Sequence, residues 1–373
     1  MTVASLNISD SFGGLGRAKK TITVDLPAPT FAPTLPGVVV SSCAAGSSPV
    51  PVPTPIARVC GQQVSVTGTV TSFNGATVSI PVVNGAVNVP PGTGTIRFTA
   101  SNANGVAATL TQTLTVVPPP AIFGLHNLTI DNSSTVGGSL FDGAGGLLTL
   151  QNDSIVGSVF SLSPVVLQDR VTASSIDTSA GVTRGNQDNI GAFLVTPPAL
   201  PVFPAFNPTF TGGRSVTVNP TPESGSVVTL APGQYGAVTV FSRGQLILSN
   251  GTYSFTSLDL EPQALLVTPS ATVETAQLFV RDSIIYRGST VTATGQAAPL
   301  FLGYAGTSSP TVTIESPFKG TIIAPTAQLN LQSLNGTGVY TGEFFANQVI
   351  LSPHTTVNSN PFTCTATCIV GCQ

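Results

Sequence analysis

One pair of acidic residues is the first candidate for chemistry in this sequence. Asp259 and Glu261 alternate with leucine in the segment LDLE, so on a strand both carboxyl groups point to one face. Such a pair could act as general acid and general base in the cleavage of a glycan, or bind Ca²⁺ through its oxygens. The simpler interpretation, which we favour, is that both are outward-facing charges that keep the surface soluble.

Five more aspartates could come into line if the fold stacks one strand on the next. A polysaccharide lyase needs a base and a set of cations that hold the acidic sugar, and cations are scarce in the second half of the chain. We therefore rank a polysaccharide lyase or hydrolase below non-enzymatic functions. The aspartates are Asp142, Asp153, Asp169, Asp177 and Asp188, and the cations are Arg214, Arg243, Arg281, Arg287 and Lys319.

The two histidines, His126 and His354, do not complete a catalytic motif. No G-x-S-x-G segment occurs, and neither histidine lies near a serine or cysteine in a nucleophile pattern. We expect His126 to have a structural, hydrogen-bonding role and His354 to lie in a turn. The sequence thus predicts a protein that is not an enzyme and that needs no cofactor and no metal.

The five cysteines form two clusters. Cys43 and Cys60 enclose a Pro-rich segment and are candidates for a disulfide-closed loop. With two histidines and no C-x-x-C, zinc is the weaker interpretation. Disulfides are typical of proteins outside the cytosol, and the odd number leaves one thiol for a bond between chains. The other disulfide candidates are Cys364, Cys368 and Cys372.

The composition limits the fold that can position these residues. Only 7% of the 373 residues are charged, with 12 Lys and Arg against 15 Asp and Glu, whereas about 25% is usual. Amphipathic helices need more charge on the face turned to solvent, and a nucleic-acid binder needs more cations. No apolar run is long enough for a transmembrane helix, and the first 20 residues lack the apolar stretch of a signal peptide. The sequence therefore predicts an all-β protein.

The chain changes character along its length, and we predict four segments. Residues 1–59 form a Pro-rich arm or linker, and residues 60–117 alternate as the short strands of a small β-sandwich do. Residues 121–362 form a parallel β-helix, and residues 363–373 form a Cys-bearing tail. Within the β-helix, the Pro-rich stretch 195–222 is expected to be a loop wrapped on the surface.

Apolar pairs at i and i+2 carry the β-helix prediction. Val238 with Val240, and Leu258 with Leu260, place two side chains on one face of a short strand, and turn residues follow each pair. Short strands at about 20 residues per turn are typical of a parallel β-helix. Tyr253, Tyr286 and Tyr304 lie in such pairs, so we expect core positions for them rather than sugar-binding platforms.

Two resemblances extend this interpretation. The hairpin-like piece from Gly94 to Gly105, followed by Leu114 to Val117, resembles the end of bacterial immunoglobulin-like surface domains, which act as spacers. The segments LAPGQYGAVTVF, LILSNGTYSF, GTIIAPTAQL and YTGEFFANQV resemble the β-helical surface domains of exported myxobacterial proteins, and loosely the β-solenoids of bactofilins and pilus-associated modules. The resemblance implies a fold, a surface location and a scaffold or adhesive role, and it brings no catalytic residue.

These observations lead to one preferred function and two alternatives. We expect a non-enzymatic, secreted or cell-surface structural protein that associates with itself or with other surface proteins, in a filament or surface layer. Low charge weakens repulsion between copies, and exposed end turns offer unpaired backbone. The first alternative is an adhesin or glycan-binding module, and the second is the lyase or hydrolase described above. Nucleic acid is not an expected partner.

Overall fold

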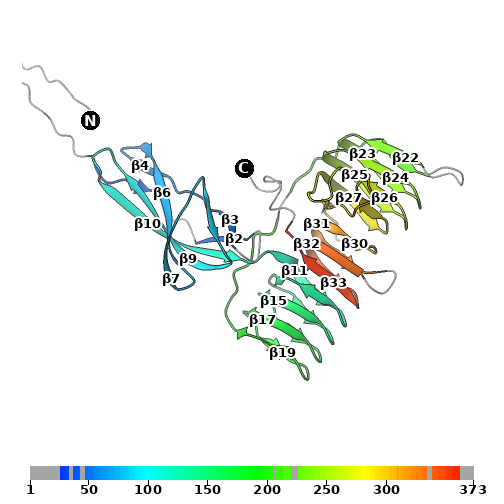
Figure 1. Ribbon diagram of the computed structural model, residues 1–373, viewed down its shortest axis with the longest axis horizontal. Helices are drawn as coiled ribbons and strands as arrows, with labels where there is room; N and C mark the ends of the chain where they lie inside the picture. Colours follow the sequence, from blue (N-terminus) through cyan, green and yellow to red (C-terminus); the bar gives the residue numbers. More distant parts are fainter. Residues whose placement is uncertain are drawn as a thin grey trace, which may run out of the picture. The chain divides into compact units, whose positions relative to one another are not determined.

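The computed structural model describes residues 26–32, 37–42, 47–204, 206–219, 226–308, 310–333 and 338–361. These residues form strands and turns without a helix, so none of them belongs to a helix that could cross a membrane. The chain divides into two compact units, Met1–Val117 and Pro118–Gln373, and each is described here by itself (Figure 1). The predicted all-β class is confirmed.

The N-terminal unit consists of short strands in small sheets. They are β1 (Thr30–Phe31), β2 (Val38–Ser41), β3 (Ser48–Pro51), β4 (Ala57–Val59), β5 (Gln62–Val64), β6 (Val66–Phe73), β7 (Ala76–Pro81), β8 (Ala86–Val89), β9 (Gly92–Ser101) and β10 (Ala107–Val117). A five-stranded sheet has the order β2-β10-β9-β6-β7, a three-stranded sheet has the order β1-β4-β5, and β3 pairs with β8. The β2–β10 pair is parallel, and the other pairs in this unit are antiparallel.

Part of the predicted arm belongs to this unit. Strands β1 to β4 lie before residue 60, and Val50 and Val52 are buried in a core with Ile96 and Phe98. The Pro-rich sequence did not indicate a strand here, because proline is unusual inside a sheet. In β3 the prolines occupy alternate, exposed positions, and the residues at the other positions are buried. The unit therefore begins earlier in the chain than the boundary we predicted at residue 60.

The C-terminal unit is a parallel β-solenoid of about 11 turns, which confirms the predicted β-helix. Its first group of strands is β11 (Pro120–Ile130), β12 (Thr135–Gly137), β13 (Ser139–Asp142), β14 (Leu147–Leu150), β15 (Ile155–Ser161), β16 (Val165–Leu167), β17 (Thr172–Thr178), β18 (Val182–Thr183), β19 (Asn189–Ile190) and β20 (Phe193–Leu194).

The second group follows after residues 195–215. It comprises β21 (Val216–Val218), β22 (Val227–Leu230), β23 (Gly233–Val240), β24 (Gln245–Leu248), β25 (Gly251–Leu260), β26 (Leu265–Val267), β27 (Ala276–Tyr286), β28 (Ser289–Val291), β29 (Leu300–Tyr304), β30 (Thr311–Ile314), β31 (Lys319–Leu331), β32 (Gly338–Leu351) and β33 (Thr355–Ser359).

The order of the turns in space differs from their order in the sequence (Figure 1). Strand β11 pairs with β13 and β14 of the next turn, and on its other edge with β32, the last long strand. From β11 the chain winds outward to β20, crosses to β21 at the opposite end, and winds back until β33 pairs with β12. We call the contact of β11 and β12 with β32 and β33 the seam.

The interior of the solenoid is a column of apolar side chains in register. Ile122 lies between Phe344 and Leu140 on the neighbouring turns, and Leu140 is followed by Val159 and Ile176. All five side chains are buried. Burying a side chain of this size contributes about 1.5–3 kcal/mol, so the stacked column is a main source of stability.

Residues 195–215, which we call the strap, cover a row of outward-facing aromatic rings. The ring of Phe203 lies 5.4 Å from Phe123 of β11 and 5.8 Å from Phe345 of β32. The ring of Phe206 lies 5.2 Å from that of Phe279 in β27. The prediction of a surface loop over 195–222 therefore fits the described residues of the strap, which crosses the seam, but it is wrong for Val216–Val218, which form β21.

Candidate functional site

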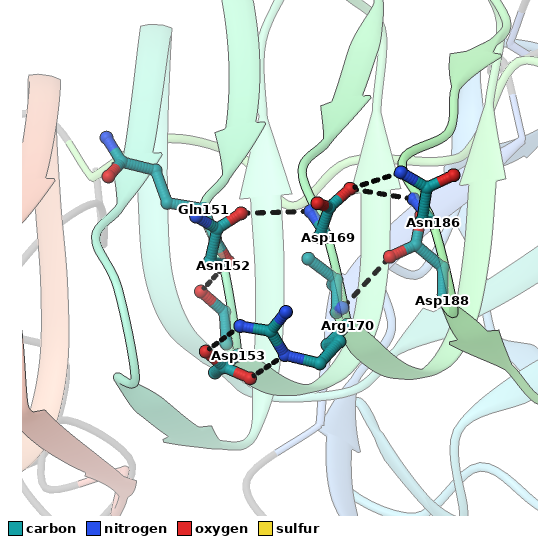
Figure 2. A network of polar contacts seen from close by, with 9 residues as sticks. Gln151, Asn152, Asp153, Asp169, Arg170, Asn186 and Asp188 are labelled. Atoms are coloured by element: carbon teal, nitrogen blue, oxygen red, sulfur yellow. Dashed lines mark hydrogen bonds and ion pairs between the residues drawn. The ribbon is translucent and has the colours of Figure 1, made fainter.

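One corner of the solenoid gathers several of the predicted aspartates into a ladder (Figure 2). The turns here repeat every 17 residues, so like positions stack directly. The side-chain oxygen of Asn152 accepts a hydrogen bond from the Asp169 amide at 3.0 Å, and a carboxylate oxygen of Asp169 accepts one from the Asn186 amide at 2.8 Å. The corner side chains of successive turns thereby satisfy the backbone of the next turn.

Charged residues at the same corner also have partners. Arg170 donates two hydrogen bonds to Asp153, at 2.6 and 2.7 Å, and this pairing lowers the pKa of Asp153 (Figure 2). The carboxylate of Asp188 accepts the backbone N–H groups of Val171 and Gly185, both at 2.9 Å. Three of the five predicted aspartates are thus brought together, but each is engaged in holding turns in register.

The other two aspartates of that set lie elsewhere. Asp177 accepts a hydrogen bond from the Thr196 hydroxyl at 3.0 Å, where the strap begins. Asp142 is fully buried, and one of its oxygens accepts the Ser161 hydroxyl at 2.9 Å, while the other has no partner among the described residues. Burial raises the pKa of Asp142 to about 6, although the hydrogen bond from Ser161 opposes this shift.

Asp259 and Glu261 each interact with a different neighbouring turn. Asp259 forms an ion pair with Arg287 at 3.1 Å, at the partly exposed outer surface of β25. Glu261 follows the end of β25 and accepts hydrogen bonds from the amide and hydroxyl of Ser242. The structure gives the two carboxylates separate partners, which suits structural roles as well as surface charges. In the part of the chain that is described, no three His, Cys, Asp or Glu side chains are grouped to hold a metal ion.

His354 lies in a turn, as expected, whereas His126 lies in a strand. His126 is in β11, and its Nδ1 is 2.6 Å from the side-chain oxygen of Asn347 in β32. This hydrogen bond crosses the seam, in agreement with the predicted structural role. His354 has a positive φ of 58° in a turn, and its amide donates to the Asn132 carbonyl at 3.0 Å.

The tyrosines belong to the core, as predicted for Tyr253, Tyr286 and Tyr304. Their rings are fully buried, as is that of Tyr340, and Tyr235 is only partly covered. Each buried hydroxyl has a partner; that of Tyr286, for example, is 2.8 Å from the Thr290 hydroxyl.

Of the cysteines, only Cys60 is among the described residues. It lies in a turn, is exposed, and forms no disulfide with another described residue. Cys43, Cys364, Cys368 and Cys372 lie outside the described residues, so the disulfide predictions, including the loop between Cys43 and Cys60, stay predictions.

Two buried acids, Glu274 and Glu343, were not among the candidates from the sequence. Glu274, just before β27, is 6% exposed, and no hydrogen bond of regular geometry reaches either carboxyl oxygen from a described residue. Burial raises the pKa of Glu274 to about 7, and nearby polar groups of Thr321 lower it only in part. The segment TVETA gives no sign of this environment, because the nearby Thr321 belongs to β31, a strand distant in the sequence.

The described surface has one more unusual feature, at the end of the first group of turns. Strand β18 pairs with β16, and β19 and β20 pair with β17, so the last turn is paired only with the turn before it. Phe193, Leu194 and Val195 are 41%, 58% and 60% exposed, and Val182 and Ile190 are partly buried against the core. We call residues 179–195 the open end.

At the opposite end of the solenoid the inward-facing side chains are more fully covered, although Val227 of β22 is 53% exposed. Val216, Val218 and Leu230, of β21 and β22, are 8%, 0% and 7% exposed. The end of the strap covers the start of β23, where the amide of Thr211 donates to Gln234 and that of Gly236 donates to the Arg214 carbonyl. The two ends therefore differ, and the open end is the candidate functional site.

Comparison with known proteins identified no relative of this chain. No model of a known protein family matches the chain, and no curated protein and no solved structure matches it.

Proposed function

We propose that this protein is a non-enzymatic structural protein of the cell exterior that associates with itself through its solenoid. The observation that carries the proposal is the open end, where exposed Phe193, Leu194 and Val195 adjoin strands paired on one edge only. An uncapped end of a repeat fold exposes core positions and backbone groups that another chain can cover. Secretion or attachment to the cell surface is part of this proposal, in keeping with the low charge of the chain.

The N-terminal unit has a role in the same proposal. Its β2–β10 parallel pair and its β10-β9-β6-β7 order are compatible with the immunoglobulin-like spacer that the hairpin sequence resembles. As a spacer, it would hold the solenoid away from an anchoring point. A filament or a surface layer, as expected from the sequence, would need a second contact besides the one at the open end.

The two alternative functions have weaker support. A glycan-binding module usually exposes aromatic rings, and here the tyrosines named above are mainly buried. A polysaccharide lyase or hydrolase needs two cooperating carboxyl groups, and Asp259 and Glu261 have separate partners. Binding to a glycan array would favour the first alternative, and activity lost in both Asp259→Ala and Glu261→Ala would favour the second.

Sedimentation velocity at increasing concentration, with electron microscopy of the same samples, tests the proposal. We expect the average mass to rise with concentration, and particles larger than one chain in the images. Monodisperse monomers at the highest concentration that stays soluble would contradict self-association.

A further inference from the structure

We propose that the open end binds the open end of a second copy of this chain, so that two molecules form a closed two-fold dimer. The inference rests on the self-association proposed above and names its surface and its partner. It predicts a finite assembly from this contact. Each molecule has a single open end, and the contact occupies the open ends of both molecules, so no further copy can be added there.

The backbone of the open end suits a partner of the same kind. Among the described residues, strands β18, β19 and β20 pair only with the preceding turn, so their outer edges have N–H and C=O groups available. A two-fold axis between two open ends makes the facing strands antiparallel, which is a favourable pairing for short edges. The apolar column meets its equivalent, since Phe193 continues the register of Ile176 and is 41% exposed.

The charges of the open end allow two copies to approach. Residues 179–195 contain one cation, Arg184, and one anion, Asp188. The guanidinium of Arg184 lies 5.5 Å from the ring centre of Phe193, and Asp188 is bound to backbone amides of its own chain. Two such surfaces therefore meet without net charge, and the apolar residues decide the contact.

The opposite end of the solenoid, at β21 and β22, is a poor partner for the open end in a head-to-tail contact. There Val216, Val218 and Leu230 are buried, and Thr211 of the strap is hydrogen-bonded to Gln234 at the start of β23, so both polar residues lie at this end. A head-to-tail partner would set the apolar open end against these polar groups. The same-end contact matches apolar surface with apolar surface instead.

The size of the surface sets the expected strength. The open end is one turn of 17 residues, smaller than the roughly 20–30 residues per partner of a standard stable interface. We therefore expect a reversible dimer whose population depends on concentration. Such a contact would matter most where the protein is concentrated, as on a crowded surface.

The test compares the full chain with variants that place lysine at selected exposed apolar positions. Leu194→Lys with Val195→Lys adds charge to the open end, and Val195→Lys alone is a milder version. Val227→Lys, at a 53% exposed valine of β22 near the other end, and Leu147→Lys, on the flank, are matched controls. Sedimentation velocity over a wide concentration range gives the mass, and the melting temperature shows whether each variant folds.

We expect the unmodified chain and both controls to approach twice the monomer mass and no more. The double variant should need a concentration at least about tenfold higher to reach the same dimer fraction, with Val195→Lys between them. If the unmodified chain stays monomeric throughout, self-association itself is overturned. If it associates and the folded double variant associates equally well, the open end is not the contact, although self-association stands. Growth beyond a dimer that Val227→Lys abolishes would show head-to-tail assembly and overturn the inference.

Discussion

The rings of Phe123 and Phe345 lie 6.3 Å apart, although one belongs to the first strand of the solenoid and the other to its last long strand. Phe203 of the strap contacts both rings. Three distant parts of the chain therefore meet in one aromatic group at the seam. The strap also connects the two groups of turns in the sequence. The aromatic group therefore joins the strap to both sides of the seam.

Replacing Phe203 by alanine should loosen the seam. The ring is partly buried against two other rings, so Phe203→Ala is expected to lower the free energy of unfolding by about 1–3 kcal/mol, less than for a fully buried phenylalanine. Urea denaturation measures the change. Val202→Ala is the matched control, since its side chain is 81% exposed and its loss should cost under about 0.5 kcal/mol. Equal effects of the two substitutions would show that the aromatic group does not stabilise the seam.

The sequence predicts the solenoid but not its seam. Pairs such as Val238/Val240 and Leu258/Leu260 mark inward positions, and all four are buried. Periodicity shows that each strand stacks on another, but the columns are built from interchangeable Ile, Leu, Val and Phe. The sequence of such a column does not indicate that β11 pairs with β32, because the apolar side chains of either strand could pack equally well on other turns.

For the candidate residues, as for the solenoid, the sequence predicted the general location but not the neighbours. The alternation in LDLE marks Asp259 and Glu261 as surface carboxylates, but their partners Arg287 and Ser242 come from adjacent turns whose register the sequence does not state. The apolar run from Phe193 to Val195 is indistinguishable from a core strand. Its exposure results from the absence of a further turn beyond it among the described residues, which is a property of the stack rather than of the run.

The corner ladder predicts a difference between two of its charged residues. Asp188 satisfies two backbone N–H groups, so Asp188→Ala should lower the free energy of unfolding by about 1–2 kcal/mol. Arg170 forms an exposed ion pair with Asp153, and Arg170→Ala should cost clearly less. Thermal melts at low and high salt distinguish the two, because only the ion pair weakens with salt. A larger loss for Arg170→Ala would contradict the assignment of the ladder as a backbone-satisfying device.

The position of Gly342 is predicted to tolerate no side chain. Its φ is 148°, and an added Cβ would lie 1.8 Å from the carbonyl oxygen of Gly320 on the preceding turn. Gly342→Ala is therefore expected to cost about 3 kcal/mol or more, or to prevent folding. Gly212 in the strap has a φ of 79° but open space around it, so Gly212→Ala should cost only about 1 kcal/mol. Chemical denaturation of both variants measures the contrast, and similar stabilities would argue against close packing of these turns.

The buried carboxyl of Glu274 predicts that stability falls as the pH rises. Its pKa in the folded protein, about 7, is above the usual 4.5, so the folded state holds this proton more tightly than the unfolded chain. The stabilising effect of the neutral carboxyl is complete below about pH 4.5 and is lost as the pH rises through 7. At pH 8 the ionised group is expected to cost up to about 3 kcal/mol.

Glu274→Gln isolates this effect, because the amide has nearly the shape of the neutral acid and does not ionise. The variant and the unmodified chain should have similar free energies of unfolding at pH 5, and the variant should be more stable at pH 8. Glu261→Gln is the matched substitution at a partly exposed carboxylate bound to Ser242, and it should bring no gain at pH 8. Urea denaturation of the three proteins at both pH values measures the difference. If Glu274→Gln gives no advantage at pH 8, the carboxyl is stabilised in its ionised form by a group beyond its described neighbours.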